Sequence, residues 1–420
     1  MLLRGADSTE VDVHAEPVAP GPSSLAAPSL PGLGAARRGG WASQDAEQDA
    51  EQDAEQDAEQ DAEQGAEQDA DMAHPVSVAP MIQWTDRHFR YYFRLISKRT
   101  LLFTEMTQSS ALFYNPSTLE RYIGPPSTAD DPLVLQLGGN DPAQMAEAAA
   151  LATSFGTYHS VNVNCGCPSN RALRAGFGAE LMLDPNLTRQ IVHAISRRCP
   201  SIDVSVKCRV GVDPERNKPE HLVEFVEACR SGGARHFIVH ARDVVLRGLS
   251  PAQNRSVPPL KYDEAFEIAS RFPELSFTIN GGIHSFEQVD EILSHGVFKG
   301  GCMIGRQAYR QAFMFAEADS RYYGERRGND EAAVLSRGMV LDKYLEYCDG
   351  LDSDVPGGNT CNLMKPLHNM FSGCEHEKAF KHSLDAALLK LKEKSVSEII
   401  ARVLDSVPEL QTFLDVPLVS

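Results

Sequence analysis

From residue 76 onward, short runs of apolar, β-branched and aromatic residues alternate with longer segments of helical periodicity. Short runs of this kind predict buried strands, and longer periodic segments that open with a capping residue predict helices. Asp141, Asp184 and Ser285 stand at the start of three longer segments, where helix N-caps belong. The predicted strands cover residues 77–81, 101–106, 133–137, 159–165, 203–209, 236–242, 276–280 and 297–305, and the predicted helices include 142–155, 186–198, 220–231, 263–271 and 285–294.

Strands that alternate with helices predict a parallel sheet, and eight strands within about 230 residues fit an α/β fold of the (β/α)8 TIM-barrel type. The rival is a doubly wound sheet, which usually has fewer strands and a glycine-rich turn after the first one. Here the first predicted strand ends in Ala79-Pro80-Met81. We therefore expect a barrel over residues 76–320 and a small all-helical domain over residues 330–415.

Residues 1–75 carry a different pattern, because residues 44–70 repeat the tetrapeptide Glu-Gln-Asp-Ala. A period of four would stack like charges in a helix, and the repeat has no apolar residue larger than alanine. We expect a disordered, solvated tail. Two alternatives stay open: residues 1–43 act as a targeting peptide, although acidic residues come early in them, or translation starts at Met72.

The composition changes this picture in one respect, the net charge. Hydrophobic residues make up 42% and charged residues 23%, which excludes a wholly disordered chain. Of the net charge of −18, residues 44–71 contribute −13 and residues 1–43 contribute −1, which leaves −4 for residues 72–420. The predicted folded part is thus nearly neutral, so the acidic total does not exclude a nucleic-acid partner.

The cysteine content and the hydropathy of the chain predict where in the cell the protein is found. Nine cysteines is an odd number, all lie at or beyond Cys165, and no clear secretory signal precedes them. This usage predicts an intracellular, reducing compartment, either the cytoplasm or, if residues 1–43 are a transit peptide, an organelle. No stretch approaches the ~20 apolar residues of a membrane helix, so we expect no membrane partner.

Polar residues and glycines follow nearly every predicted strand. In a barrel of this type the active site lies at the carboxyl ends of the strands. One polar residue there is usually only part of the hydrogen-bonded structure, but convergence from seven or eight strands favours a functional site. These residues are Pro80 and Met81, Glu105, Gln136, Asn164 and Cys167, Lys207, His240 and Arg242, Asn280 with Gly281 and Gly282, and Gly305 with Arg306.

The last two strand ends predict a phosphate site. Gly281-Gly282 and the glycines 300, 301 and 305 let the backbone approach a ligand closely, and Arg306 adds a bidentate cation. The loops after strands seven and eight are the usual phosphate site of this fold.

A flat ring is the second part of the predicted ligand. Met81, Gln136 and Lys207 combine an apolar side chain, an amide and a cation. These groups suit a heterocycle with a polar edge, and a cation near an electron-accepting ring stabilises its anionic reduced form. The pattern therefore indicates a flavin.

Cys167 is the candidate reactive group. Cys165 and Cys167 form a Cys-x-Cys pair, but no second cysteine or histidine pair stands nearby, so we expect no metal. Cys165 falls within a predicted strand, as a structural cysteine would. Cys167 lies past the strand end between Gly166 and Pro168, where a thiol can donate a proton or act as a nucleophile.

These residues belong to motifs that occur together in one known family. In chain order they are Ala79-Pro80-Met81, Thr104-Glu105-Met106, Leu135-Gln136-Leu137-Gly138-Gly139, Asn164-Cys165-Gly166-Cys167-Pro168-Ser169, Val206-Lys207-Cys208-Arg209, His240-Ala241-Arg242, Gly248-Leu249-Ser250-Pro251, Asn280-Gly281-Gly282-Ile283 and Gly305-Arg306. The chain from about residue 77 to 310 resembles the tRNA-dihydrouridine synthases, and within them the branch that reduces D-loop uridines 20 and 20a.

The resemblance implies a bound FMN, NADPH as the reductant, a tRNA substrate and tRNA binding by residues 330–415. It implies that hydride reaches C6 of the uracil and that Cys167 protonates C5. We expect a monomer. By position, the resemblance implies cofactor contacts for Pro80, Met81, Gln136, Lys207, His240, Asn280, Gly281, Gly282, Gly305 and Arg306, and tRNA contacts for Asn164, Arg171 and Arg255.

Asp243 and Ala252 depart from the family pattern, since lysine is common at both positions. We expect both to remove positive charge from the RNA side of the protein. Two other functions stay open: a flavin-dependent barrel oxidoreductase that acts on a small molecule, and a non-catalytic tRNA-binding protein with the same fold.

Overall fold

The computed structural model describes residues 74–115, 119–124, 132–215, 218–324, 335–351, 360–390 and 395–418. The chain divides into two units, Met1–Asp71 and Met72–Ser420, and the structure described below belongs to the second. The predictions for the acidic repeat, for residues 1–43 and for Met72 lie outside the described residues.

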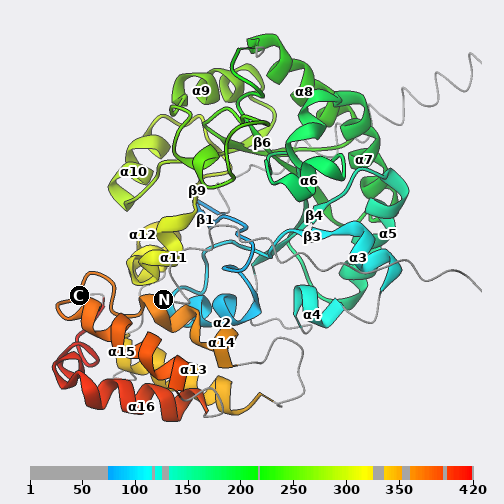
Figure 1. Cartoon of the computed structure of the whole chain (residues 1–420). Coiled ribbons are helices and arrows are strands. Elements are labelled where there is room, and N and C mark those ends of the chain that lie inside the picture. The colour runs from blue at the N-terminus through cyan, green and yellow to red at the C-terminus, as the bar shows by residue number, and fades with distance from the viewer. Residues whose placement is uncertain are drawn as a thin grey trace, which may run out of the picture. The chain divides into compact units, whose positions relative to one another are not determined.

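The described chain forms a closed parallel barrel (Figure 1). The order of strands around it is β1-β9-β8-β7-β6-β5-β4-β2, and β3 pairs with the end of β4. A bridge between Ser77 and Leu101 closes the ring, and the Val78 N–H donates to the Leu101 carbonyl at 2.9 Å. The strands are β1 Val76–Val78, β2 Leu102–Phe103, β3 Thr107–Gln108, β4 Leu133–Gly138, β5 Ser160–Asn164, β6 Asp203–Arg209, β7 His236–His240, β8 Ser276–Asn280 and β9 Cys302–Ile304.

The predicted (β/α)8 fold is confirmed. The second predicted strand is broken into β2 and β3, which together occupy one place in the barrel. The helices around the strands are α2 Arg87–Ile96, α3 Ser109–Tyr114, α4 Leu119–Ile123, α5 Pro142–Phe155, α6 Asn170–Arg174, α7 Pro185–Arg198, α8 Pro219–Ser231, α9 Tyr262–Arg271, α10 Phe286–Ser294, α11 Arg306–Arg310 and α12 Ala318–Tyr323, with 3-10 turns η3 Gly178–Leu183, η4 Gln253–Arg255 and η5 Ala312–Glu317.

The three predicted helix caps are present. The side chains of Asp141 and Asp184 accept the N–H of the third residue after them at 2.9 Å, and Ser285 does so at 3.4 Å. Each cap satisfies one of the free N–H groups at a helix start, worth about 1 kcal/mol.

Side chains alternate between the two faces of each barrel strand. In β5, Val161 and Val163 belong to the main apolar core between strands and helices, whereas Asn162 and Asn164 are buried polar residues at the intervening positions. Since successive side chains of a strand point to opposite faces, the polar ones fill the barrel interior. A smaller apolar cluster lies on that inner face and comprises Ala79, Leu101, Phe103, Val134, Ile238 and Met303.

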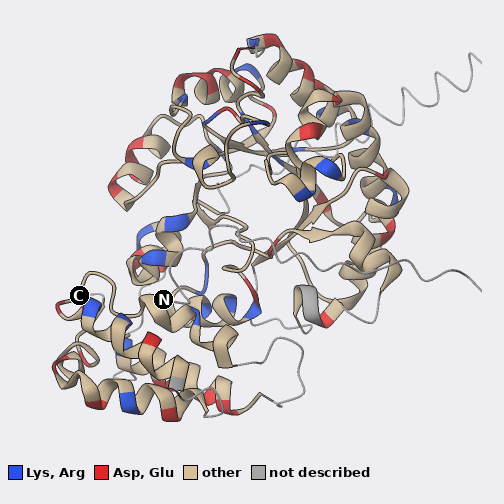
Figure 2. Cartoon of the chain, in the orientation of Figure 1, with Lys and Arg blue, Asp and Glu red and all other residues tan. Residues whose placement is uncertain are grey.

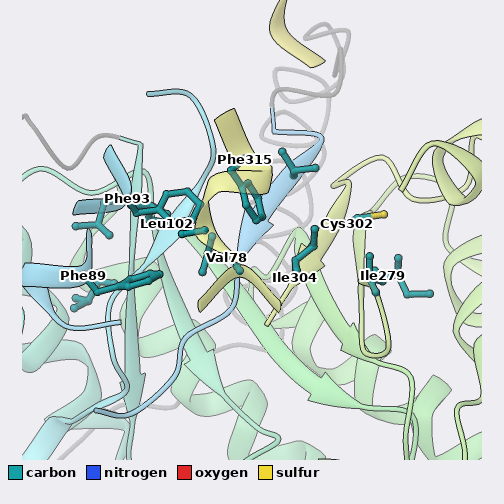
Figure 3. Close-up of a cluster of buried hydrophobic side chains, with 14 of the residues drawn as sticks. Val78, Phe89, Phe93, Leu102, Ile279, Cys302, Ile304 and Phe315 are labelled. Atoms are coloured by element: carbon teal, nitrogen blue, oxygen red, sulfur yellow. The ribbon is translucent and has the colours of Figure 1, made fainter. Parts of the chain in front are cut away.

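The outer core is rich in aromatic side chains. Figure 3 shows Phe89 and Phe93 of α2 and Phe315 of η5 beside Val78 and Ile304 of the neighbouring strands β1 and β9. Phe93 and Phe315 are fully buried, with ring centroids 4.9 Å apart. Burial of such side chains contributes about 1.5–3 kcal/mol each and fixes α2 against the strands.

A helical region follows the barrel and contacts it through α2. Tyr91 of α2 stacks on Tyr347 at a centroid distance of 3.9 Å, and the Nδ1 atom of His88 lies 2.9 Å from the Tyr347 hydroxyl. Residues 72–420 cluster as one compact unit, so the division into residues 76–320 and 330–415 stays a prediction. The region contains α13 Arg337–Asp349, α14 Thr360–Met364, η6 Pro366–Asn369, α15 Glu377–Lys390, α16 Val396–Ser406 and η7 Pro408–Phe413.

In the part of the chain that the structure describes, every helix falls short of the length and apolarity needed to cross a bilayer.

Candidate active site at the barrel mouth

A buried polar layer crosses the barrel interior below its mouth. Gln136, Asn162 and Ser205 are paired across three neighbouring strands. Gln136 Nε2 donates to Asn162 Oδ1 at 2.8 Å, and Asn162 Nδ2 donates to Ser205 Oγ at 2.9 Å. Gln136 is only 1% exposed, so its hydrogen bonds hold a rigid polar floor rather than a solvated surface.

Asn164 connects this floor to Cys167. The Asn164 Nδ2 atom donates to Gln136 Oε1 at 2.9 Å, and its Oδ1 accepts the backbone N–H of Cys167 at 3.0 Å. This side-chain turn fixes the loop directly after β5. The half-buried Cys167 thiol donates to Ser169 Oγ at 3.3 Å. The sulfur therefore sits on a loop whose position is set from inside the barrel.

Three basic residues lie within electrostatic range of Cys167. Lys207, Arg209 and Arg255 each interact electrostatically with Cys167. Lys207 Nζ donates to Asn280 Oδ1 at 3.0 Å, and burial, with a smaller effect of Arg209, lowers the pKa of Lys207 to about 7. Burial also lowers the pKa of Arg209 to about 10. Both basic side chains are thus held inside the barrel mouth, where burial disfavours their charged forms and a bound anion would favour them.

Arg209 is built into the wall of the mouth. It is 4% exposed, and its guanidinium donates to the carbonyls of Gly166 at 3.3 Å and Asn254 at 3.0 Å. It thereby ties the Cys167 loop to the loop after β7.

His240, at the end of β7, is held by a glycine. Gly281 has a φ of +110°, and a Cβ at this position would lie 2.5 Å from His240 Cδ2. Burial, and then the cations Arg209, Lys207, Arg242 and Arg306, keep the pKa of His240 well below its usual value. The imidazole is therefore neutral at physiological pH and presents one donor and one acceptor.

The change Gly281→Ala is expected to destabilise the protein by about 3 kcal/mol or more, because it combines left-handed backbone strain with the displacement of His240. Gly248→Ala is the matched control, since Gly248 has a φ of +90° and nothing within 4 Å of the added Cβ. The control is expected to lose only the backbone term of about 1–2 kcal/mol. Urea unfolding of both variants measures the difference, and equal losses would show that the fit against His240 is unimportant.

The sequence model of one protein family, described as dihydrouridine synthase, matches residues 77–406. The chain belongs to the dihydrouridine synthase family. It is therefore an oxidoreductase on a TIM-barrel fold.

Three similar proteins are named tRNA-dihydrouridine(20/20a) synthase. That of Shewanella oneidensis is 38% identical over 308 residues, covering 73% of this chain and 87% of the relative. Those of Synechocystis and Salmonella typhi are 38% and 37% identical and are covered over 90% and 96% of their lengths, with 75% and 78% of this chain. Among solved structures, the old yellow enzyme of Trypanosoma cruzi aligns over 58% of this chain and 88% of its own with a TM-score of 0.44 at 10% identity, a likeness too weak to bear on function.

Hydrogen bonds and close contacts link most of the residues predicted for the site. Besides the contacts above, Asn280 Nδ2 donates to the Met303 carbonyl at 2.8 Å, and Arg306 Nη2 donates to the Arg255 carbonyl at 3.2 Å. Gly305 follows β9, and a Cβ there would find only Ala79, the residue after β1, nearby, at 3.7 Å.

Four predicted positions are arranged differently. Pro80 and Met81 follow β1, where the Met81 backbone bonds to the Thr85 hydroxyl. Gly282 packs against the loop after β7, because a Cβ there would lie 2.5 Å from Leu260. Arg171 is exposed on α6 and donates to Gln108 Oε1 at 2.9 Å.

The prediction that Gly300 and Gly301 approach a ligand is wrong. The strand predicted over residues 297–305 is only Cys302–Ile304, so both glycines precede it and lie at the end away from the mouth. A Cβ on Gly300 would lie 2.6 Å from Thr278 Oγ1, and Gly301 packs on the backbone before β1. These glycines serve the packing of strands.

The prediction that Asp243 removes positive charge from the RNA side is also wrong. Asp243 is fully buried and pairs with Lys261 Nζ at 2.9 Å. Its carboxylate is compensated within the protein and does not face a ligand surface. Ala252, in contrast, is exposed, as that prediction requires.

Sequence reasoning assigned no role to Arg209, although the signal was available. Arg209 lies two residues after Lys207 in one strand, so both side chains point to the same face. A second basic residue at this spacing, in the strand whose end carries a candidate site residue, predicts a pair of interior cations.

Proposed function

We propose that this protein reduces the C5–C6 double bond of uridine 20 or 20a in the D-loop of tRNA, with FMN as its bound flavin and NADPH as the reductant. The names of the relatives support the substrate. The observation that carries the chemistry is the position of Cys167 on a loop that Asn164 fixes through the backbone N–H, within electrostatic range of Lys207, Arg209 and Arg255.

The residues at the mouth fit an anionic flavin. Lys207 is buried against a neutral amide, and the buried Nε of Arg242 has no hydrogen-bond acceptor among the described residues. An amine whose charged form is disfavoured by burial, and a guanidinium without a carboxylate partner, both favour an anionic ligand that balances their charge. Lys207, His240, Asn280, Gly281, Gly305 and Arg306 are the residues we propose to hold the flavin, with Gln136 below it and Pro80, Met81 and Gly282 at the rim. When bound and reduced, a flavin supplies a hydride to C6 of the uracil.

Cys167 supplies the proton. Its Sγ–H bond breaks and a C–H bond forms at C5, so that hydride and proton together add two hydrogens across the double bond. Lys207, Arg209 and Arg255 interact electrostatically with Cys167, so we propose that they act on the negative charge that this step leaves on the sulfur. The Asn164 amide keeps the loop in place through the Cys167 N–H, so the thiol need not be ordered at each turnover.

The uridine must leave the tRNA stack before it can enter the barrel. Extrusion costs a few kcal/mol and is least costly in a loop. Arg171 and Arg255 are exposed cations near the mouth and are proposed to bind the RNA, with Asn164 below them. Because the substrate is tRNA, we propose that the protein acts inside the cell.

The decisive experiment incubates the purified holoprotein with NADPH and an unmodified tRNA transcript. Mass spectrometry of nuclease fragments should find two added hydrogens on the uridine at position 20 or 20a, and none when that uridine is replaced by cytidine. NADPH oxidation with small-molecule acceptors but no tRNA product would favour the small-molecule oxidoreductase. A protein that binds tRNA but has no bound flavin and forms no product would favour the non-catalytic alternative.

A further inference from the structure

A basic cluster lies near the ends of β7 and β9 and comprises Arg242, Arg255, Arg306 and Arg310; two of these arginines bind the same loop. Arg306, the first residue of α11, donates to the Arg255 carbonyl at 3.2 Å, and Arg242 donates through Nη1 to the Pro258 carbonyl three residues farther along. Arg310 follows Arg306 by one helical turn, so both project from the same side of α11. Figure 2 shows basic positions along α11. The loop over residues 255–258 is thus bound by two guanidinium groups at its two ends.

The cluster has no acidic counterpart in the described part of the chain. None of the ion pairs formed between described residues includes any of the four arginines. After burial, the groups that lower the pKa of Arg306 are Arg255, Arg310 and Arg242, all cations. The protein therefore holds these like charges together without neutralising them.

The positive charge of the four arginines is larger than one phosphate group can neutralise. A phosphate monoester such as that of a flavin mononucleotide carries a charge of about −2 at neutral pH. The four guanidinium groups carry four positive charges, because arginine stays protonated in proteins. About two positive charges are left over, which corresponds to a further anion beside the cofactor phosphate.

We propose that Arg310, with Arg255, forms a second phosphate site that binds the sugar-phosphate backbone of the tRNA next to the extruded uridine. This inference rests on the proposed function and extends it to a residue and a contact. Arg306 and Arg242, which are half-buried, take the cofactor phosphate, and the exposed pair Arg255 and Arg310 takes the RNA.

The arginine cluster extends away from the barrel mouth, which favours RNA over the phosphates of the reductant as its second ligand. A nicotinamide dinucleotide must place its ring at the barrel mouth, whereas the cluster runs outward along α11 to the exposed Arg310. From there the hydroxyl of Tyr309, on the same helix, contacts the Lys365 carbonyl of the helical region at 3.3 Å. The helix that carries Arg310 therefore touches the helical region, and an exposed cation at this place fits a polyanion that extends over both regions.

The test measures tRNA binding by the flavin-loaded protein over a series of salt concentrations. Arg310→Gln is expected to weaken binding about three- to tenfold and to reduce the slope of log K against log salt by about one, the effect of one lost phosphate contact. Arg310→Lys keeps the charge and should keep most of the slope. Arg271→Gln is the matched control, because Arg271 is exposed at the end of α9, on the side of the barrel where β8 begins.

The flavin content and the KM for NADPH are expected to stay at wild-type values in Arg310→Gln. A higher KM for NADPH with unchanged tRNA binding would overturn the inference in favour of the dinucleotide. Equal salt slopes for wild type and Arg310→Gln would overturn it as well. If the wild-type protein neither binds tRNA nor forms dihydrouridine, the proposed function fails as well. If the wild-type protein turns over normally and Arg310→Gln binds tRNA as tightly as wild type, only the inference about Arg310 fails.

Discussion

Cys167→Ala is expected to lower the rate of uridine reduction by about 10²–10⁴, the usual contribution of a positioned general acid. Alanine keeps the loop, because Asn164 binds the backbone N–H of residue 167 rather than its side chain. Flavin content and melting temperature should therefore stay near wild type. Single-turnover measurement of dihydrouridine formation in tRNA tests the prediction.

Cys165→Ala is the control for this substitution. Cys165 lies two residues earlier, is fully buried in the outer core, and burial raises the pKa of its thiol well above the usual value. It cannot replace Cys167 as the acid, so turnover by this variant should stay within about threefold of wild type, with some loss of stability from the smaller side chain. Equal loss of activity in both variants would contradict the assignment of the proton to Cys167.

The protein is expected to lose several kcal/mol of stability as the pH falls from about 6.5 to about 4, because two histidines are buried in neutral form. His74 and His236 lie at the amino-terminal end of the barrel, opposite the proposed site. Burial, followed by His159 and nearby arginines, lowers the pKa of His74 to about 4. Burial, followed by His159, lowers the pKa of His236 to about 4.

Proton uptake by the unfolded chain explains why the stability falls, rather than rises, as the pH is lowered. Between pH 6.5 and 4 the unfolded chain binds protons at these positions and the folded chain does not, so the stability that is complete above pH 6.5 is lost as the pH falls. Below pH 4, each of these two histidines lowers the free energy of unfolding by roughly 3 kcal/mol relative to pH 7. His240, whose pKa is also lowered, acts in the same direction.

Urea unfolding at pH 7.5, 6.0 and 5.0 measures this dependence. In His236→Gln the amide can still bond to Thr278 Oγ1, which lies 2.7 Å from His236 Nε2, while the titrating group is gone. The loss of stability between pH 7.5 and 5.0 should then be smaller than in wild type by about 1–2 kcal/mol. His193→Gln, an exposed position on α7, is the control. Parallel pH curves for His236→Gln and wild type would refute the prediction.

Much of the fold was predictable because the signals are local. A buried strand needs a short apolar run, and a helix start needs a side-chain acceptor such as Asp141, so eight strands and several helices could be placed from the chain alone. The errors lie where local pattern and backbone geometry differ. Residues 297–301 read as apolar strand, yet Gly301 has a φ of +84° and forms a turn before β9.

The proposed site was predictable only as a set of residues. The rule that function lies at strand ends selected Gln136, Cys167, Lys207 and His240 without any knowledge of their contacts. Asp243 was misread, because its neighbours in the chain say nothing about Lys261, which pairs with it from another loop.

By itself, the sequence determined that a parallel barrel forms and that a thiol, an amide and several cations follow its strands, since apolar periodicity and strand ends are encoded by neighbouring residues. Only the tertiary structure decided that Asn164 holds both Gln136 and Cys167. It also decided that Arg209 binds the Gly166 carbonyl beside Cys167 and that Arg242 and Arg306 bind the loop that begins at Arg255. Such contacts join residues far apart in the chain, and they arise only when the register of the closed barrel brings alternate side chains of separate strands onto one face.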